Sequence, residues 1–200
     1  MKAPVGVILA GGQATRMGGG DKGLRPLGDT TILGHVIDRL SPQVADLALN
    51  ANGDASRFDL GMPVLPDSLT GFAGPLAGVL AGLDWAADLG ADTIVTAAAD
   101  TPFFPCDLVP HLLLASENMD NPLALAATRE NGKLYRHPTF GIWPVALRED
   151  LRQALKDGLR KVVLWTDQHA GRVAEFPVTR FDPFFNVNTP ADLAAAEGYL

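Results

Sequence analysis

The chain has 200 residues, 47% of them hydrophobic and 20% charged, which suits a single globular domain with one well-buried core. Its net charge of −7 opposes binding to nucleic acid, because that affinity depends on neutralising many phosphates. A single cysteine excludes an internal disulfide and a thiolate zinc site, and no stretch reaches the roughly 20 apolar residues of a membrane span, so we expect a cytoplasmic protein without membrane contacts.

The first predicted element is a short apolar strand over residues 5–10, and a glycine-rich loop follows it as far as residue 23. A run without polar residues is typical of a strand buried on both faces of a parallel sheet. Six glycines in thirteen positions let the loop turn sharply and bring bare N–H groups against a ligand. Its two cations, Arg16 and Lys22, suit a polyphosphate.

Two familiar phosphate-binding motifs do not fit this loop. A Walker loop needs Gly-Lys followed by Ser or Thr, whereas the order here is Asp21-Lys22-Gly23. The string Gly18-x-Gly20-x-x-Gly23 begins well after the strand and runs into Leu24-Arg25-Pro26 instead of opening a helix. A surface loop without any ligand remains the alternative interpretation.

Strands and helices alternate through the first half of the chain. Three alternations predict a doubly wound, mostly parallel α/β sheet of the Rossmann-like type, with right-handed crossovers. The expected elements are a helix over 32–40, strands over 44–49 and 62–67, a helix that starts near 75, and a strand over 93–99.

The second half is less regular and predicts an antiparallel element. A turn signal at residues 130–133 separates a strand over 123–128 from an expected antiparallel partner over 139–143. The other expected elements are helices over 107–117, 146–157 and 161–168, strands over 172–176 and 185–188, and a final helix that Thr189 and Pro190 begin.

Polar side chains follow the predicted parallel strands where each strand ends. Asn50, Asn52, Asp67 and Asp100 occupy these positions, and ligands bind at this edge of an open α/β sheet. Asp100 is the expected Mg²⁺ ligand, because a hard cation prefers carboxylate oxygen. The alternatives are that Asp100 caps the following helix and that Asp67 forms a turn.

Three further polar residues lie in the second half. Asn186 and Asn188 are two residues apart on a predicted strand, so they would share a face and point at one ligand or at a metal-bound water; a polar edge strand is the alternative. His137 precedes a proline at the entry of a strand, where a lone histidine more often makes a structural hydrogen bond than takes part in catalysis.

Taken together, these motifs resemble the molybdenum cofactor guanylyltransferase family. The matching stretches span essentially the whole chain, and Gly11 favours the guanylyl over the cytidylyl branch, which typically has alanine there. The motifs are Leu9-Ala-Gly-Gly12, Arg16-Met-Gly18, Asp21-Lys22-Gly23, Asp67, Gly74-Pro-Leu-Ala-Gly78, Ala99-Asp-Thr-Pro102, His137-Pro-Thr139 and Asn186-Val-Asn-Thr-Pro190. The chain departs from the family at Ala99, where cysteine is usual, and at Ala14-Thr15, which replaces a more basic pair.

The resemblance implies transfer of GMP from GTP to the phosphate of molybdopterin carrying molybdenum, with release of pyrophosphate and use of Mg²⁺. It also implies transient contact with molybdenum-insertion proteins and acceptor apo-enzymes. The expected GTP contacts are Leu9, Ala10, Gly11, Gly12, Lys22, Asn50, Asp67 and Asp100, and Asp100 would also bind the metal.

For the chemistry we expect in-line displacement aided by Lys22, Arg16 and Asp100, because the chain offers charge stabilisers but no nucleophile with an adjacent base. We expect a nucleotide-binding half over 1–105 and an acceptor-binding half over 106–200, with His137, Lys161, Asn186 and Asn188 as acceptor contacts. A sugar-1-phosphate or cytidylyl-type nucleotidyltransferase, or a non-catalytic nucleotide-binding protein, are the rival interpretations.

Overall fold

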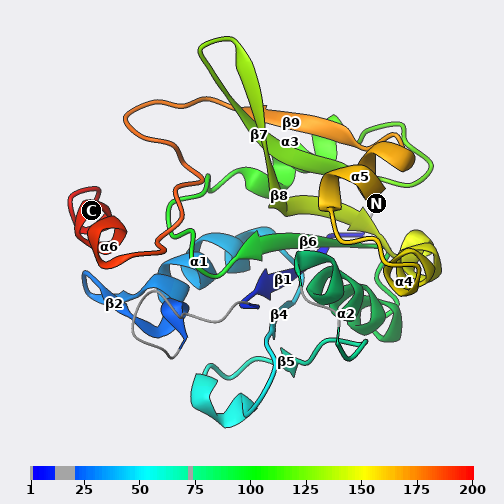
Figure 1. Cartoon of the computed structure of the whole chain (residues 1–200), viewed down its shortest axis with the longest axis horizontal. Helices are drawn as coiled ribbons and strands as arrows, with labels where there is room; N and C mark the ends of the chain where they lie inside the picture. Colours follow the sequence, from blue (N-terminus) through cyan, green and yellow to red (C-terminus); the bar gives the residue numbers. More distant parts are fainter. Residues whose placement is uncertain (1, 12–20, 72–73) are drawn as a thin grey trace.

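The computed structural model describes residues 2–11, 21–71 and 74–200. Gly12 and Arg16, which the sequence assigns to GTP binding and catalysis, lie outside these residues. The predicted fold class is confirmed, because seven strands form one mostly parallel sheet with an antiparallel strand inside it (Figure 1).

The sheet has the strand order β5-β4-β1-β6-β8-β7-β9. Every neighbouring pair is parallel except the two that involve β8, which runs antiparallel to β6 and to β7. The strands are β1 (Val5–Leu9), β4 (Leu47–Asn50), β5 (Val64–Leu65), β6 (Thr93–Ala98), β7 (Ala124–Glu130), β8 (Lys133–Pro144) and β9 (Arg172–Phe176). Strands β2 (Pro26–Leu27) and β3 (Thr30–Thr31) form a separate small hairpin.

The described residues contain six α-helices. Thr31 caps the first by accepting a hydrogen bond from the N–H of Gly34, and Thr189 forms a capping box with Asp192 at the last. The helices are α1 (Ile32–Leu40), α2 (Pro75–Asp88), α3 (Leu108–Ala115), α4 (Arg148–Lys156), α5 (Val162–Gln168) and α6 (Pro190–Glu197). Over the described part of the chain, no helix combines the length and apolar character that crossing a membrane requires.

The hydrophobic core lies on both faces of the sheet. Alternation along β1 sends Ile8 to one face, where α1 and α3 pack, and Val7 to the other, where α2, α4 and α5 pack (Figure 1). Trp143 and Trp165 are fully buried in the core on the second face.

Two strand predictions in the first half are too long. β4 begins at Leu47 because residues 41–43 form a 3-10 turn and the Asp46 carboxylate accepts a hydrogen bond from the N–H of Leu47. β5 contains only Val64 and Leu65, which lie between two prolines that lack an N–H donor.

The predicted strand over 185–188 is wrong. Residues 185–188 belong to no strand of the sheet, and the backbone N–H of Val187 donates a hydrogen bond to the carbonyl of Asp100. In Figure 1 the chain leaves β9 and crosses to α6 beside the β2 hairpin, so it passes over the end of the sheet instead of extending it.

β8 is longer than the predicted 139–143 and is bulged. The register against β7 shifts between Leu125 and Ala126, opposite the segment that contains Pro138. Since proline cannot donate to the ladder, the irregularity accommodates it.

The strand order reverses at β1. The connection through α1 leads to β4 on one side of β1, and the connection through α2 leads to β6 on the other. Such a switch point opens a crevice at the carboxyl ends of the two central strands, which here are β1 and β6.

Candidate active site

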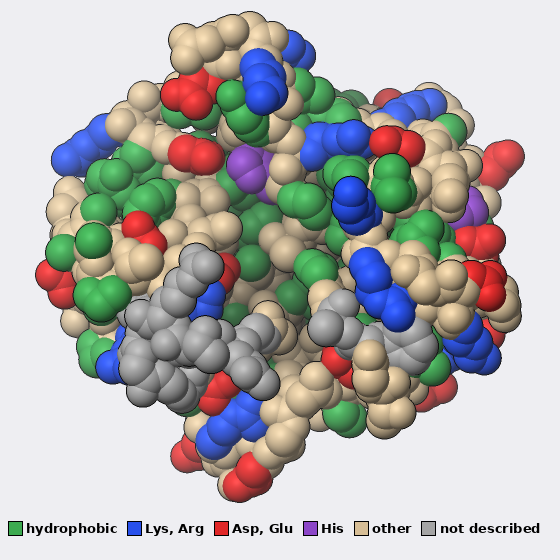
Figure 2. All heavy atoms as spheres, viewed as in Figure 1, with side chains coloured by type: hydrophobic (Ala, Val, Ile, Leu, Met, Phe, Trp, Pro, Cys, Tyr) green, Lys and Arg blue, Asp and Glu red, His purple; other side chains and the backbone are tan. Residues whose placement is uncertain are grey.

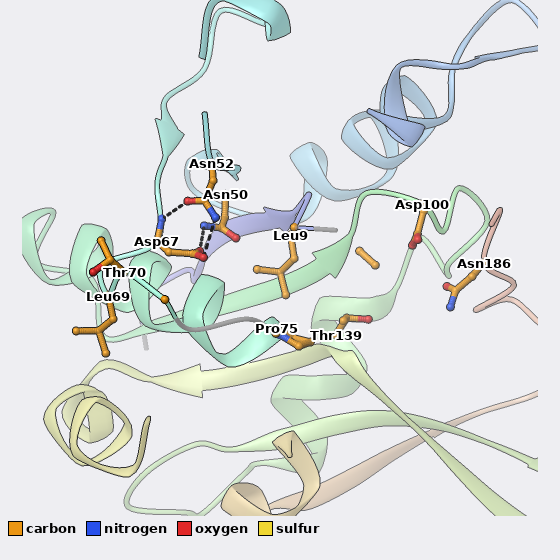
Figure 3. Close-up of a pocket in the computed structure, with 14 residues that line it drawn as sticks. Leu9, Asn50, Asn52, Asp67, Leu69, Thr70, Pro75, Asp100, Thr139 and Asn186 are labelled. Atoms are coloured by element: carbon orange, nitrogen blue, oxygen red, sulfur yellow. Dashed lines mark hydrogen bonds between the residues drawn. The ribbon is translucent and has the colours of Figure 1, made fainter. Parts of the chain in front are cut away.

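A cleft of about 870 Å³ opens at this switch point. Leu9, the last residue of β1, and Asp100, which follows β6, lie in it, and Asn50 and Asp67 lie at its other end (Figure 3). The remaining lining residues are Gly11, Asn52, Leu69, Thr70, Gly71, Gly74, Pro75, Ala98, Thr139 and Asn186. Figure 2 shows this face hollowed near its centre, with charged side chains around the rim of the hollow.

Lys22 and Asp100 form an ion pair beside the cleft. The Nζ of Lys22 lies 2.9 Å from Oδ2 of Asp100, and the two side chains keep 20% and 22% of their surface exposed. They are 78 residues apart in sequence, so the fold alone brings them together. With both charges near water, the pair can open to accept a phosphate and a cation in exchange.

The backbone around Lys22 packs tightly next to Asp100. Lys22 begins a short 3-10 helix, η2 (Lys22–Leu24). A Cβ on Gly23 would lie 3.2 Å from Cβ of Leu33 and 3.4 Å from the carbonyl oxygen of Ala99. Glycine therefore lets this turn lie directly against the residue before Asp100.

The loop that contains Asn186 and Asn188 joins this end of the cleft. Asn188 Oδ1 accepts a 2.6 Å hydrogen bond from Lys22 Nζ, and Asn186 Oδ1 accepts one from the hydroxyl of Thr101. The sequence predicted that both asparagines lie on one face of a strand, whereas they reach the site from the loop before α6. Asn186 lines the cleft, whereas Asn188 holds the lysine.

Asp192 fixes the same loop from α6. Its carboxylate accepts hydrogen bonds from the N–H groups of Asn188 and Thr189, at 3.0 and 2.8 Å. Although desolvation acts in the opposite direction, these hydrogen bonds and the nearby charge of Lys22 hold the pKa of Asp192 below its usual range. The carboxylate is therefore charged at neutral pH.

Asn50, Asn52 and Asp67 form a hydrogen-bonded cluster at the opposite end of the cleft (Figure 3). The amides of Asn50 and Asn52 each donate to one oxygen of the Asp67 carboxylate, at 3.0 and 2.8 Å. Asn52 Oδ1 in turn accepts from the N–H of Asp67 at 2.9 Å. Each carboxylate oxygen keeps a lone pair for a ligand donor.

Helix α2 closely approaches this cluster at Gly78. A Cβ there would lie 2.2 Å from Oδ1 of Asn50 and 2.9 Å from Cδ2 of Leu9. In the sequence, Gly78 is part of a motif without a role of its own, and Leu69 and Thr70, which also line the cleft, carry no signal that marks them.

Two predicted acceptor contacts lie apart from these clusters. His137, on β8, stacks on the ring of Phe184 with a centroid distance of 4.2 Å and shares a 2.9 Å hydrogen bond with Thr128. Lys161 is exposed at the start of α5 and is not among the described residues that line the cleft. Ala10 lines a smaller cavity that adjoins the cleft at Leu9, Gly11 and Asp100.

Burial lowers the pKa of His137, while the negative charge of Asp182 opposes that shift. We expect stability to fall as pH drops below about 6.5, because the unfolded chain then binds a proton that the folded histidine resists. The contribution is at most about 1.4 kcal/mol per pH unit. Urea unfolding between pH 7.5 and 5.5 should show a shallower dependence for His137→Gln, and equal slopes for the two proteins would contradict this assignment.

The donor set near Asp100 suits a hard cation that a substrate also ligates. The available groups are one carboxylate and the amide oxygens of Asn186 and Asn188, all oxygen donors. Among the described residues, no three His, Cys, Asp or Glu side chains group closely enough to hold a metal ion alone. A metal here would need phosphate oxygens and water to complete its shell.

Comparisons with known proteins identify relatives along nearly the whole chain. A family model described as a MobA-like NTP transferase domain matches residues 6–171. A molybdenum cofactor guanylyltransferase of Bradyrhizobium sp. (strain ORS 278) is 52% identical over 96% of this chain and 91% of its own length. A protein of the same name from Mesorhizobium japonicum is 48% identical over 98% and 95%.

Solved structures share the fold. Molybdopterin-guanine dinucleotide biosynthesis protein A from Archaeoglobus fulgidus has a TM-score of 0.71 at 24% identity, over 98% of this chain and 97% of that one. A nucleotidyl transferase from Methanothermobacter thermautotroptrophicus has a TM-score of 0.74 at 19% identity, over 100% and 98%.

Proposed function

The chain belongs to the MobA-like NTP transferase family, and from that premise we propose how its cleft transfers GMP from GTP to the phosphate of molybdopterin carrying molybdenum. The protein is a nucleotidyltransferase of the molybdenum cofactor guanylyltransferase type. The observation that carries the assignment of roles is the Lys22–Asp100 pair at one end of a cleft whose other end presents Asn50 and Asp67.

The phosphates of GTP belong at the Lys22 end in this proposal. Lys22 is a compact cation already held by Asp100 and Asn188, so its position is set before substrate arrives. On binding, a phosphate replaces Asp100 as its partner. Phosphoryl transfers depend mainly on alignment and charge stabilisation, which a fixed ammonium supplies. Arg16 is proposed to add a second positive charge.

Asp100 is proposed as the Mg²⁺ ligand, with the amide oxygen of Asn186 nearby as a second donor. A nucleotidyltransferase of this kind uses a divalent metal, which would neutralise charge on the moving and leaving oxygens. Once Lys22 turns to phosphate, the Asp100 carboxylate is available to a cation. Two hydrogen bonds hold the backbone around Asp100. The hydroxyl of Thr101 donates to the side chain of Asn186, and the N–H of Val187 donates to the carbonyl of Asp100.

Guanine is proposed to bind at the Asn50 and Asp67 end. The guanine edge carries an N–H and an amino group, two donors that a carboxylate with free lone pairs accepts. The backbone of Leu9, Ala10 and Gly11 lies between this end and Asp100, where it would contact the nucleoside. The cleft then spans the nucleotide from base to triphosphate.

The acceptor is proposed to enter from the second half. Thr139 and Asn186 line the cleft there, and His137, two residues before Thr139 on β8, is proposed as a further acceptor contact. Residues 1–105 would thus bind the nucleotide and 106–200 the acceptor within a single domain. We place the reaction in the cytoplasm, with transient contacts to molybdenum-insertion proteins and acceptor apo-enzymes.

Pyrophosphate release measured with each acceptor tests the assignment. With GTP and Mg²⁺, molybdopterin carrying molybdenum should release pyrophosphate and form the guanine dinucleotide. Glucose-1-phosphate and mannose-1-phosphate serve as rival acceptors. Release with a sugar phosphate but not with the pterin would contradict the proposal, and binding of GTP without any turnover would favour a non-catalytic nucleotide-binding protein.

Calorimetric titration should show that GTP binds at least about 100-fold more tightly than CTP, because cytosine offers one amino donor beside an acceptor nitrogen and cannot donate to both oxygens of Asp67. The Asp67→Asn variant is the matched control, since it keeps the shape of the side chain and loses the charge. Its preference for GTP should shrink. Equal affinities of the wild type for the two nucleotides would exclude base recognition by this cluster.

A further inference from the structure

We propose that Arg57 is a positioning residue that fixes Lys22 through Asp21 and ties the phosphate end of the cleft to the base end. The inference rests on the proposed function, because it concerns how GTP is held. Arg57 lies in η4 (Ala55–Phe58), within the connection between β4 and β5, and neither the motifs nor the family resemblance assigned it a role.

The guanidinium of Arg57 joins one side-chain carboxylate and two backbone carbonyls. Its Nε donates to Oδ2 of Asp21 at 2.6 Å, and one Nη donates to the carbonyl of Asn52 at 2.8 Å. The other Nη donates to the carbonyl of Asp54. The planar fork thus uses donors in several directions, an arrangement that a lysine cannot reproduce.

The contact between Arg57 and Asp21 lies next to Lys22 in the chain. Asp21 is the residue before Lys22 and the N-cap of η2, and its carbonyl accepts the N–H of Leu24 at 3.1 Å. Holding the Asp21 carboxylate therefore fixes where η2 begins. Because Gly23 already packs against Leu33 and Ala99, the turn is held from two sides and Lys22 projects toward Asp100.

The Asn52 contact extends the link to the other end of the cleft. Arg57 donates a hydrogen bond to the backbone carbonyl of Asn52, and the side-chain amide of Asn52 donates to the Asp67 carboxylate. One guanidinium thus connects the segments that carry the proposed phosphate and base contacts, which are otherwise separated by the cleft.

The surroundings of Arg57 favour a defined geometry. The ion pair with Asp21 is partly buried, with side-chain exposures of 30% and 23%, so solvent weakens it less than it weakens an exposed pair. The guanidinium also lies 4.2 Å above the ring centroid of Phe58, a buried residue that lines the small cavity beside Lys22.

The test compares Arg57→Ala with Arg57→Lys and with a control variant, Arg129→Ala, whose ion pair lies elsewhere in the protein. Arg129 and Glu175 form a two-pronged ion pair on the second half, with both distances 2.9 Å, so Arg129→Ala removes a similar contact away from the cleft. We expect Arg57→Ala to raise the dissociation constant and KM for GTP about tenfold while the acceptor KM stays within about twofold. Arg57→Lys should recover only part of the loss, and Arg129→Ala should match the wild type.

A double-mutant cycle with Asp21→Asn separates positioning from direct contact. If Arg57 acts through Asp21, adding Asp21→Asn to Arg57→Ala should weaken GTP binding less than the two single effects combined. Full additivity, an unchanged GTP affinity in Arg57→Ala, or equal rises in both KM values would overturn the inference. A wild type that binds no GTP would instead overturn the proposed function, and this inference with it.

Discussion

The Asp100→Asn variant is expected to lose about 100- to 1,000-fold in kcat for GMP transfer, the usual effect of removing a preorganised charge stabiliser. Asparagine keeps the size of the side chain and can still contact Lys22 and Thr101, so the fold should be preserved. What it loses is the negative charge that a hard cation requires. The rate of pyrophosphate release at saturating GTP and acceptor measures the effect.

The Lys22 ion pair gives this variant a second, opposite signature. In the wild type, a phosphate must displace the Asp100 carboxylate from the Nζ of Lys22, 2.9 Å away. Asparagine competes less for that ammonium, so metal-free binding of GTP should be as tight as in the wild type or tighter. Damage to the fold would weaken binding and turnover together, which distinguishes the two explanations.

Asp107→Asn is the matched control for Asp100→Asn. Asp107 is an exposed aspartate at the start of α3, where it pairs only with His111 among the described contacts, and turnover should be unaffected. Near-normal Mg²⁺-dependent turnover in Asp100→Asn would remove Asp100 from the proposed metal site.

The sequence predicts that the glycine loop and Asp100 lie at the same edge of the sheet, although it does not predict the direct ion pair between Lys22 and Asp100. A buried apolar strand followed by a glycine loop, and a second one followed by Asp100, predict parallel neighbours whose carboxyl ends meet. The structure brings these two ends together at β1 and β6. Short-range patterns sufficed here because they fixed the direction of each strand.

Contacts that depend on irregular backbone could not be predicted in this way. Arg57 lies in a single 3-10 turn inside a loop, where no periodicity indicates which way a side chain points. Asn186 and Asn188 have the spacing of a strand, yet the segment pairs with the carbonyl of Asp100 instead of with a sheet neighbour. Local patterns do not reveal which partner a backbone will find.

Gly78→Ala is expected to weaken GTP binding more than tenfold. The new Cβ would lie 2.2 Å from Oδ1 and 2.9 Å from Cγ of Asn50, a buried side chain that must rotate to make room. Rotation breaks the hydrogen bonds from Asn50 to the Asp67 carboxylate and to the carbonyl of Leu65, at 3.0 and 3.1 Å. Because alanine favours a helix by about 1 kcal/mol over glycine, α2 itself offsets part of the strain.

Gly82→Ala, one turn later on the same helix, should lower stability and leave GTP binding unchanged. Its Cβ would meet Cγ2 of Val7 at 2.8 Å and Cδ1 of Ile94 at 3.0 Å, two fully buried core side chains outside the cleft. Overpacking of this kind costs about 1–3 kcal/mol, so the free energy of unfolding should fall while GTP affinity stays near that of the wild type. Urea unfolding and calorimetric titration of both variants measure the two quantities. If both variants lose stability and affinity in the same proportion, Gly78 serves only helix packing, and the base-binding role proposed for Asn50 loses its support.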